Sequence, residues 1–388
     1  MKKIGYFTCA ALLALGSCTN EINEEGFVDK ANTISFSAYS SKTRAEDSYQ
    51  SGDVTLDEMK KGSFGVVGYD NSDNEIYLGA ENKAIQQVWK SDATGTGGSW
   101  EYANAEEMKY WPAGGSMDFV AYFPYSENGA TFKSIKNDTD PVMTITNKTG
   151  NQDVLFSYLA NKAQDERVHL YFNHAFSKLA SVIIQVNLPQ TEVIISKVEV
   201  LNTSTKGDIN VFSSNQASYT PSTDDEIRSF DFSDSPKSIT ISNTEGVKLF
   251  DNDANGYLFA TNASMKHNVT GTGKKMWDGV KEHITGTNKL LSESDLVCLK
   301  LTCKVKAANE YLVGNETSDG VMYIPMSGTS DSNLEITELL AGRRYTYKII
   351  MASNVGYKDT GEPIQLAPIR FSVYEVTNWA DVTVTINL

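Results

Sequence analysis

Short runs in which apolar and polar residues alternate recur along the whole chain, separated by Asn, Asp, Gly and Ser. Alternation with a period of two is typical of half-buried β-strands, because successive side chains point to opposite faces of a sheet. Only residues 56–61, 103–109 and 334–340 have a pattern that fits a short helix each. The pattern therefore predicts an all-β protein. The clearest predicted strands are residues 34–38, 64–69, 118–123, 182–186 and 382–386.

The predicted strands are too many for one β-sandwich. A single sandwich of the immunoglobulin type takes about 100 residues, whereas this chain has 388 residues. A polar run at residues 159–166 separates two apolar stretches and marks the best place for a domain boundary. We therefore predict two serial β-sandwich domains, one at residues 45–165 and the other at residues 166–388.

The amino terminus carries the features of a bacterial lipoprotein signal peptide. Two lysines precede the apolar run 4–15, and residues 15–18 read Leu-Gly-Ser-Cys, the small-residue cleavage box before a lipidated cysteine. The apolar run is too short to cross a membrane, since a transmembrane helix needs roughly 20 apolar residues. We expect residues 1–17 to be removed and Cys18 to carry the lipid that attaches the precursor to the outer membrane.

Residues 18–44 are predicted to form a leader between the lipid and the first sandwich. Residues 19–30 are polar and acidic, without periodicity, as in a flexible tether. Residues 34–38 follow as the first predicted strand. The leader therefore combines a tether with one strand.

The net charge bears on the partners that the protein can bind, and the cysteines bear on whether it can form a disulfide. The formal net charge is −15 at pH 7, whereas a nucleic-acid-binding protein needs a basic face, so nucleic acid is not an expected partner. Beyond the signal peptide and Cys18, only Cys298 and Cys303 remain. Their odd separation on a predicted strand places them on opposite faces, too far apart for a disulfide.

The chain lacks the usual patterns of catalytic residues. It contains no G-x-S-x-G motif, and only four histidines could act as bases. His169 and His174 lie five residues apart on a predicted strand and therefore face opposite sides, which disfavours a metal pair. We expect neither enzymatic activity nor a cofactor.

One segment partly matches a calcium-binding loop. Asp251, Asp253 and Asn255 provide oxygen ligands at alternate positions before a glycine. The twelfth position of the loop is Asn262 instead of a bidentate glutamate, and the flanking residues have a strand pattern. A hairpin turn is therefore the preferred interpretation, with calcium as a weak alternative.

A cluster of aromatic residues lies between positions 110 and 125. An exposed cluster of this kind could stack on a sugar, but the surrounding alternation favours packing in a core. The residues are Tyr110, Trp111, Phe119, Tyr122, Phe123 and Tyr125.

Several short segments, in order along the chain, match a known family together. They are residues 15–18, 33–39, 43–45, 110–112, 117–124, 153–157, 170–179 and 341–347. Each segment is short, but together they extend over most of the chain. In this combination the chain resembles the fimbrillin-like family of Bacteroidetes surface proteins, which are subunits of type V pili.

The resemblance implies transthyretin-like sandwiches and assembly by strand exchange at the cell surface. An arginine-specific protease would cut between Arg44 and Ala45 and remove the leader with its strand. In that strand Ile34, Phe36 and Ala38 share one face and would fill the amino-terminal core. Their removal would leave an apolar groove and unpaired backbone groups along two strands, which a strand from another subunit could occupy.

The carboxyl terminus offers such a strand. Val382, Val384, Ile386 and Leu388 alternate with polar residues up to the last position. The segment could be donated to another subunit, or it could close its own sandwich, and the pattern fits both.

Two functions remain open from the sequence. The first is a structural subunit or an accessory component, at the tip or the anchor, of a cell-surface fimbria, with other pilus subunits as partners. The second is a monomeric surface lipoprotein that binds a glycan or a host protein.

Overall fold

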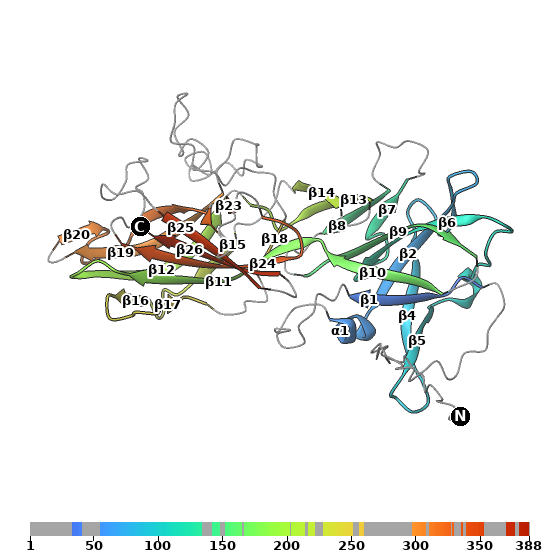
Figure 1. The fold of residues 1–388 in the computed structure, drawn as a ribbon, viewed down its shortest axis with the longest axis horizontal. Helices are drawn as coiled ribbons and strands as arrows, with labels where there is room; N and C mark the ends of the chain where they lie inside the picture. Colours follow the sequence, from blue (N-terminus) through green and yellow to red (C-terminus); the bar gives the residue numbers. More distant parts are fainter. Residues whose placement is uncertain are drawn as a thin grey trace, which may run out of the picture.

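The structure is a computed structural model, and it confirms that the chain is all-β (Figure 1). No helix in the described part of the chain is long and apolar enough to cross a membrane. The described residues are 33–40, 55–133, 142–147, 152–164, 167–201, 203–213, 216–221, 228–250, 256–259, 297–307, 310–326, 328–329, 335–336, 339–352, 370–376 and 380–387.

The largest sheet lies in the half of the molecule that contains the first strand. Its strand order is β1-β10-β9-β6-β2-β4-β5, and β3 pairs with β2. Its strands are β1 (Phe36–Ser40), β2 (Ser63–Asp70), β3 (Glu75–Leu78), β4 (Ile85–Ser91), β5 (Gly98–Tyr102), β6 (Ser116–Phe123), β9 (Leu155–Ala163) and β10 (Val168–His174).

The middle strands of this sheet are covered on both faces. One face packs around the core that contains Phe36, Phe64 and Phe172. The other face packs in a second core together with a four-stranded sheet. Two-sided burial explains why β2 and β6 are apolar almost without interruption. The four-stranded sheet consists of β7 (Ala130–Phe132), β8 (Met143–Asn147), β13 (Gly207–Ser213) and β14 (Gln216–Pro221), in the order β14-β13-β8-β7.

The strand pairing does not follow the predicted domain ranges. Residues 168–174, expected in the carboxyl-terminal domain, form β10 within the first sheet. The chain also returns from the other half, because β13 pairs with β8. Pairing between segments so far apart in the sequence cannot be recognised from a local pattern of apolar and polar residues. The pattern therefore could not show that residues 168–174 belong to the first sheet.

The other half of the molecule consists of two facing sheets and a short two-stranded one. One sheet has the order β17-β11-β24-β26-β25, with β18 beside β11, and the other has the order β15-β12-β19-β20, with β16 beside β12 and β21 beside β19. Their strands are β11 (Phe176–Val186), β12 (Thr191–Leu201), β15 (Arg228–Asp231), β16 (Lys237–Thr240), β17 (Val247–Lys248), β18 (Tyr257–Phe259), β19 (Cys298–Ala307), β20 (Glu310–Val313), β21 (Gly320–Pro325), β22 (Gly328–Thr329), β23 (Glu335–Ile336), β24 (Arg343–Met351), β25 (Arg370–Val376) and β26 (Ala380–Asn387).

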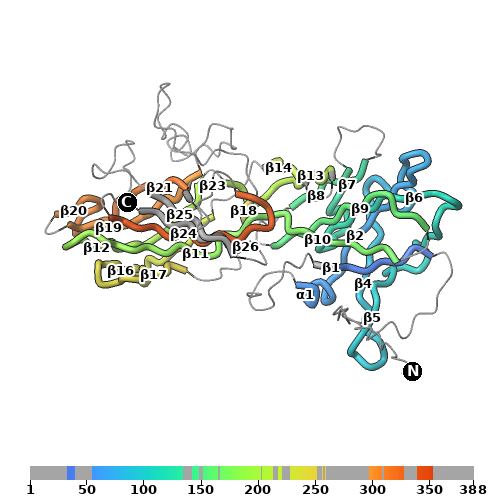
Figure 2. The backbone as a smooth tube through the Cα atoms, in the orientation of Figure 1, coloured from blue at the N-terminus to red at the C-terminus, as the bar shows by residue number. Residues whose placement is uncertain are grey.

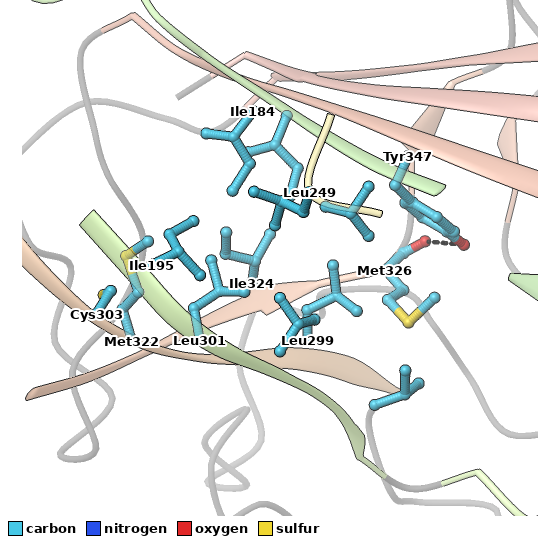
Figure 3. Close-up of a cluster of buried hydrophobic side chains, with 14 of the residues drawn as sticks. Ile184, Ile195, Leu249, Leu299, Leu301, Cys303, Met322, Ile324, Met326 and Tyr347 are labelled. Carbon is cyan, nitrogen blue, oxygen red and sulfur yellow. Dashed lines mark hydrogen bonds between the residues drawn. The ribbon is translucent and has the colours of Figure 1, made fainter. Parts of the chain in front are cut away.

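A single apolar core fills the space between these two sheets (Figure 3). Ile184 and Tyr347 approach from one sheet, and Leu301 approaches from the other (Figure 3). The hydroxyl of Tyr347 donates a hydrogen bond to the backbone oxygen of Met326, at 3.2 Å. Cys303 lies in this core, whereas Cys298 packs with Leu201 and Tyr323 in a separate cluster, so the two free thiols occupy opposite faces, as predicted.

A single residue joins the two halves at the main crossing. Ala175 lies between β10 and β11 and is fully buried. Its amide donates to the backbone oxygen of Val154 at 2.8 Å, and its carbonyl accepts from the hydroxyl of Tyr219 at 2.5 Å. Both backbone groups of the crossing residue are therefore hydrogen-bonded to the half that contains the first strand or to the strands that return to it.

The three predicted helices have different outcomes. Residues 56–61 form α1 (Leu56–Lys61), as predicted. Within residues 103–109 only the 3-10 turn η1 (Ala105–Glu107) is present. The prediction for residues 334–340 is wrong, because Glu335–Ile336 forms β23 and pairs with β22. Short segments of this kind take the conformation that their sheet neighbours impose.

Candidate functional site

The first strand, β1, lies at an edge of the largest sheet. It lies beside β10 (Figure 2) and pairs with it in parallel. Phe36 stands opposite Val168, and Ser37 stands opposite His169. The amide of Val168 donates to the backbone oxygen of Ser35 at 2.8 Å. Within the described part of the chain, β10 is the only strand that pairs with β1.

The other side of this segment is held by isolated contacts. The amide of Ile34 donates to the backbone oxygen of Lys109 at 3.0 Å, and Thr33 forms a single bridge with Tyr110. The hydroxyl of Tyr102 donates to the backbone oxygen of Ile34 at 2.9 Å. Unpaired backbone groups along two strands were expected after loss of β1, but in the structure only β10 would lose a row of strand pairing.

The inward side chains of this segment belong to the core of the sheet. Ile34, Phe36 and Ala38 are 0%, 2% and 4% exposed. The ring of Phe36 meets the ring of Phe119 edge-on, with centroids 5.6 Å apart, and lies 6.3 Å from the ring of Tyr102. Side chains this deep cannot be withdrawn without opening an apolar groove.

A short helix covers the same core. α1 begins after Thr55, whose side chain accepts a hydrogen bond from the amide of Glu58. Met59 is fully buried in the core that contains Phe36, and Lys60 lies over the ring of Trp89 at 4.9 Å. α1 is therefore part of the frame around the first strand.

The outward side chains of β1 contact those of β10. The Ser37 hydroxyl and Nδ1 of His169 share a hydrogen bond of 2.7 Å. The ring of Tyr39 stacks on that of Tyr171 with centroids 5.5 Å apart, and Tyr171 is 56% exposed. From the sequence, His169 was considered only as a possible metal ligand. The alternation in residues 168–172 could have shown that its side chain points away from the core. It could not have shown that Ser37 lies opposite.

His174 and Asp153 meet at the opposite end of β10. Nδ1 of His174 lies 2.7 Å from Oδ2 of Asp153, whose side chain is completely buried. This contact joins two segments that carried the family resemblance, residues 153–157 and 170–179. His169 and His174 therefore face opposite sides, as predicted, and have different partners. In the described residues no three potential metal ligands gather into one cluster.

The carboxyl-terminal strand lies inside its own sheet. β26 pairs in parallel with β24 and antiparallel with β25, so that Val382 stands opposite Tyr345 and Glu375. Val384 and Ile386 occupy the following pairs of the same ladder. A strand with neighbours on both sides must break both ladders before it can leave.

Several predicted positions lie outside the described residues. They are Cys18, Arg44, Ala45, Asp251, Asp253, Asn255 and Leu388.

Most of the aromatic cluster packs in the cores, as the alternation favoured. Trp111, Phe119, Tyr122 and Phe123 are buried. Tyr125 is half-buried against the second core, and Tyr110 is 57% exposed.

A family model described as fimbrillin-like matches residues 43–363. The chain belongs to the fimbrillin-like family. The resemblance read from the sequence is therefore confirmed, and a role in fimbriae or adhesion at the cell surface follows from it.

Two solved structures are similar to this fimbrillin-like chain. A fimbrial protein from Bacteroides vulgatus has 15% identity and a TM-score of 0.42, and the match covers 92% of this chain and 97% of that protein. A fimbrilin from Porphyromonas gingivalis has 11% identity and a TM-score of 0.37, with 92% and 96% covered. No curated protein matches the chain.

Alkaline pH is expected to destabilise the protein through its buried tyrosines. Burial raises the pKa of Tyr102 well above its ordinary value, and burial together with the Asp118 carboxylate raises the pKa of Tyr158 to about 12. A phenol with a raised pKa in the folded state contributes stability that is complete below the unfolded pKa of about 10. That stability is lost as the pH rises from about 10 toward about 12.

The measurement is denaturant unfolding at several alkaline pH values. Tyr102→Phe should make the decline of stability less steep, and Tyr110→Phe, at an exposed ring, is the matched control. Equal slopes for the two variants would contradict the assignment.

Proposed function

We propose that this fimbrillin-like chain is a structural subunit, or an accessory component at the tip or anchor, of a cell-surface fimbria. It is exported as a lipoprotein through Cys18 and arranged as two sandwiches in series. An arginine-specific protease then cuts between Arg44 and Ala45, and subunits assemble by strand exchange.

The position of the first strand carries this proposal. β1 lies at a sheet edge and pairs with one strand, yet its inward residues fill the core. Burying a side chain such as Phe36 contributes about 1.5–3 kcal/mol. A cut in the segment that follows β1 would therefore turn a covalently held strand into a replaceable one. The empty place would favour any strand with a similar apolar face.

The replacement strand is proposed to be β26 of a second copy. It alternates apolar and polar residues, and it already pairs in parallel with β24, as β1 does with β10. Release of β26 requires the ladders with β24 and β25 to open. A subunit that keeps β26 in place can accept a strand but cannot donate one, which would limit it to one end of a fibre.

Proteolysis of the purified precursor tests the proposal. The chain is treated with an arginine-specific protease, the new amino terminus is sequenced, and the product is run on a gel without boiling. A start at Ala45 and a ladder of bands are expected. A different start contradicts the cleavage step, and a correct start without a ladder contradicts assembly by strand exchange.

Replacing Arg44 with alanine is expected to block both events, because the protease recognises the arginine side chain. The variant should keep its leader and run as a single band. Lys42→Ala is the matched control, since it removes a neighbouring positive charge and leaves Arg44 in place. A ladder from Arg44→Ala would show that assembly does not depend on this cut.

The exposed rings of Tyr110 and Tyr171 favour a second function, glycan binding by a monomer. A single band on the unboiled gel, together with retention on a glycan column, would support it.

A further inference from the structure

The inner face of the groove distinguishes poorly between strands. The residues that fill it, Ile34, Phe36 and Ala38, contribute only apolar surface to the core. Apolar residues at alternate positions occur in most strands of this chain, and exchange of one aliphatic side chain for another of similar volume usually costs less than about 1.5 kcal/mol. Selection of a particular strand therefore needs a contact of another kind.

The outer face of β10 provides one. His169 stands opposite Ser37, and its Nδ1 shares a hydrogen bond of 2.7 Å with the serine hydroxyl. The ring of Tyr39 lies 5.5 Å from the imidazole, so an aromatic ring borders this hydrogen bond. His169 is itself half-buried, which makes loss of its partner more costly than at a fully exposed site.

We infer that His169 is a specificity-determining residue for strand exchange, and that it favours an incoming strand with a hydroxyl group at the position opposite to it. The inference rests on the proposed function, because it describes which strand the same groove accepts. Nδ1 of His169 has a hydrogen-bond partner whether or not it carries a hydrogen, because a hydroxyl group can both donate and accept. An alanine or valine at that position leaves Nδ1 without a partner.

The terminal strand of a second copy meets this requirement. When its apolar residues face the core, the outward positions of β26 are Thr383, Thr385 and Asn387. The register between the incoming strand and β10 decides whether Thr383 or Thr385 stands opposite His169. A shift of the incoming strand by two residues replaces one threonine with the other at that position. A strand with valine or leucine on both faces would fill the groove but fail to pair with the imidazole.

A competition experiment measures this preference directly. The full chain is cut after Arg44 in the presence of two differently labelled peptides at equal concentration. The first pair is the leader peptide 33–40 against its Ser37→Ala variant, and the matched control replaces Ser35 instead. A net hydrogen bond of about 0.5–1.5 kcal/mol corresponds to a preference of about 2- to 13-fold for the unmodified peptide. The Ser35→Ala control should show no preference.

The same competition identifies the register of the terminal strand. Peptides of residues 380–388 with Thr383→Val or Thr385→Val compete with the unmodified peptide. One of the two substitutions should lower capture by a similar factor, and the other should not.

A variant of the groove links these preferences to the imidazole. In His169→Phe the Ser37→Ala effect should disappear, whereas His169→Asn keeps a hydrogen-bonding group near the position of Nδ1 and should restore part of it. The competition of the Ser37→Ala and Ser35→Ala peptides for the wild-type chain does not depend on the folding of either His169 variant.

The outcomes separate the two hypotheses. Capture of the unmodified peptides with equal capture of the Ser37→Ala peptide overturns the role of His169 and leaves strand exchange intact. An effect of Ser37→Ala that persists in His169→Phe also overturns it. If neither unmodified peptide is captured, strand exchange itself is wrong and the inference fails with it.

Discussion

Replacing Phe36 with alanine is expected to lower the free energy of unfolding of the uncleaved chain by about 3–5 kcal/mol. The ring is 2% exposed and contacts Phe119 and Tyr102. Its removal takes away buried apolar surface and leaves a cavity at a sheet edge. Denaturant unfolding monitored by tryptophan fluorescence measures the change, because Trp100 and Trp111 lie in the same core.

Ser35→Ala is the control for this prediction. Ser35 directly precedes β1 and is only half-buried, so its loss should change stability by less than about 0.5 kcal/mol. After the chain is cut, the Phe36→Ala leader should also dissociate faster than the wild-type leader, which gel filtration can follow. Equal unfolding curves for Phe36→Ala and the wild type would mean that the first strand does not stabilise the core.

Removal of residues 380–388 is expected to prevent stable folding of the carboxyl-terminal half. β26 lies between β24 and β25, so its loss leaves β24 without a partner on one side and detaches β25 from the sheet. The total stability of a domain is about 5–15 kcal/mol, and an interior strand contributes a large share of it. We expect loss of the cooperative thermal transition of this half and rapid proteolysis within it.

A chain that lacks only Leu388 is the control, because β26 ends at Asn387. Addition of a peptide of residues 380–388 should restore part of the lost transition. An unchanged melting curve for the truncated chain would contradict the prediction. It would also support the hypothesis that β26 can be donated to another subunit without destabilising its own.

The Phe36→Ala substitution and the removal of residues 380–388 bear on the role of the subunit in a fibre. A strongly held β26 combined with a removable β1 favours a component that accepts a strand and donates one only after its own sheet opens. A loosely held β26 favours a repeating stalk subunit.

The family and the all-β class were accessible from the sequence. The alternation at residues 34–38 identified the face with Phe36, and the pattern at residues 56–61 identified α1. These features depend on residues close together in the chain, whose periodicity follows directly from backbone geometry.

The neighbours of each strand were decided by the tertiary structure. The alternation of a strand reports which of its faces is buried, but it carries no information on which other strand lies beside it. The return of β13 to β8 and the interior place of β26 depend on pairing across long stretches of sequence. The same holds for the contact between Ser37 and His169, which are 132 residues apart. The sequence by itself thus determined the class of fold and the apolar face of the first strand. Only the tertiary structure placed that strand at a sheet edge beside β10, because strand neighbours are set by packing between distant segments.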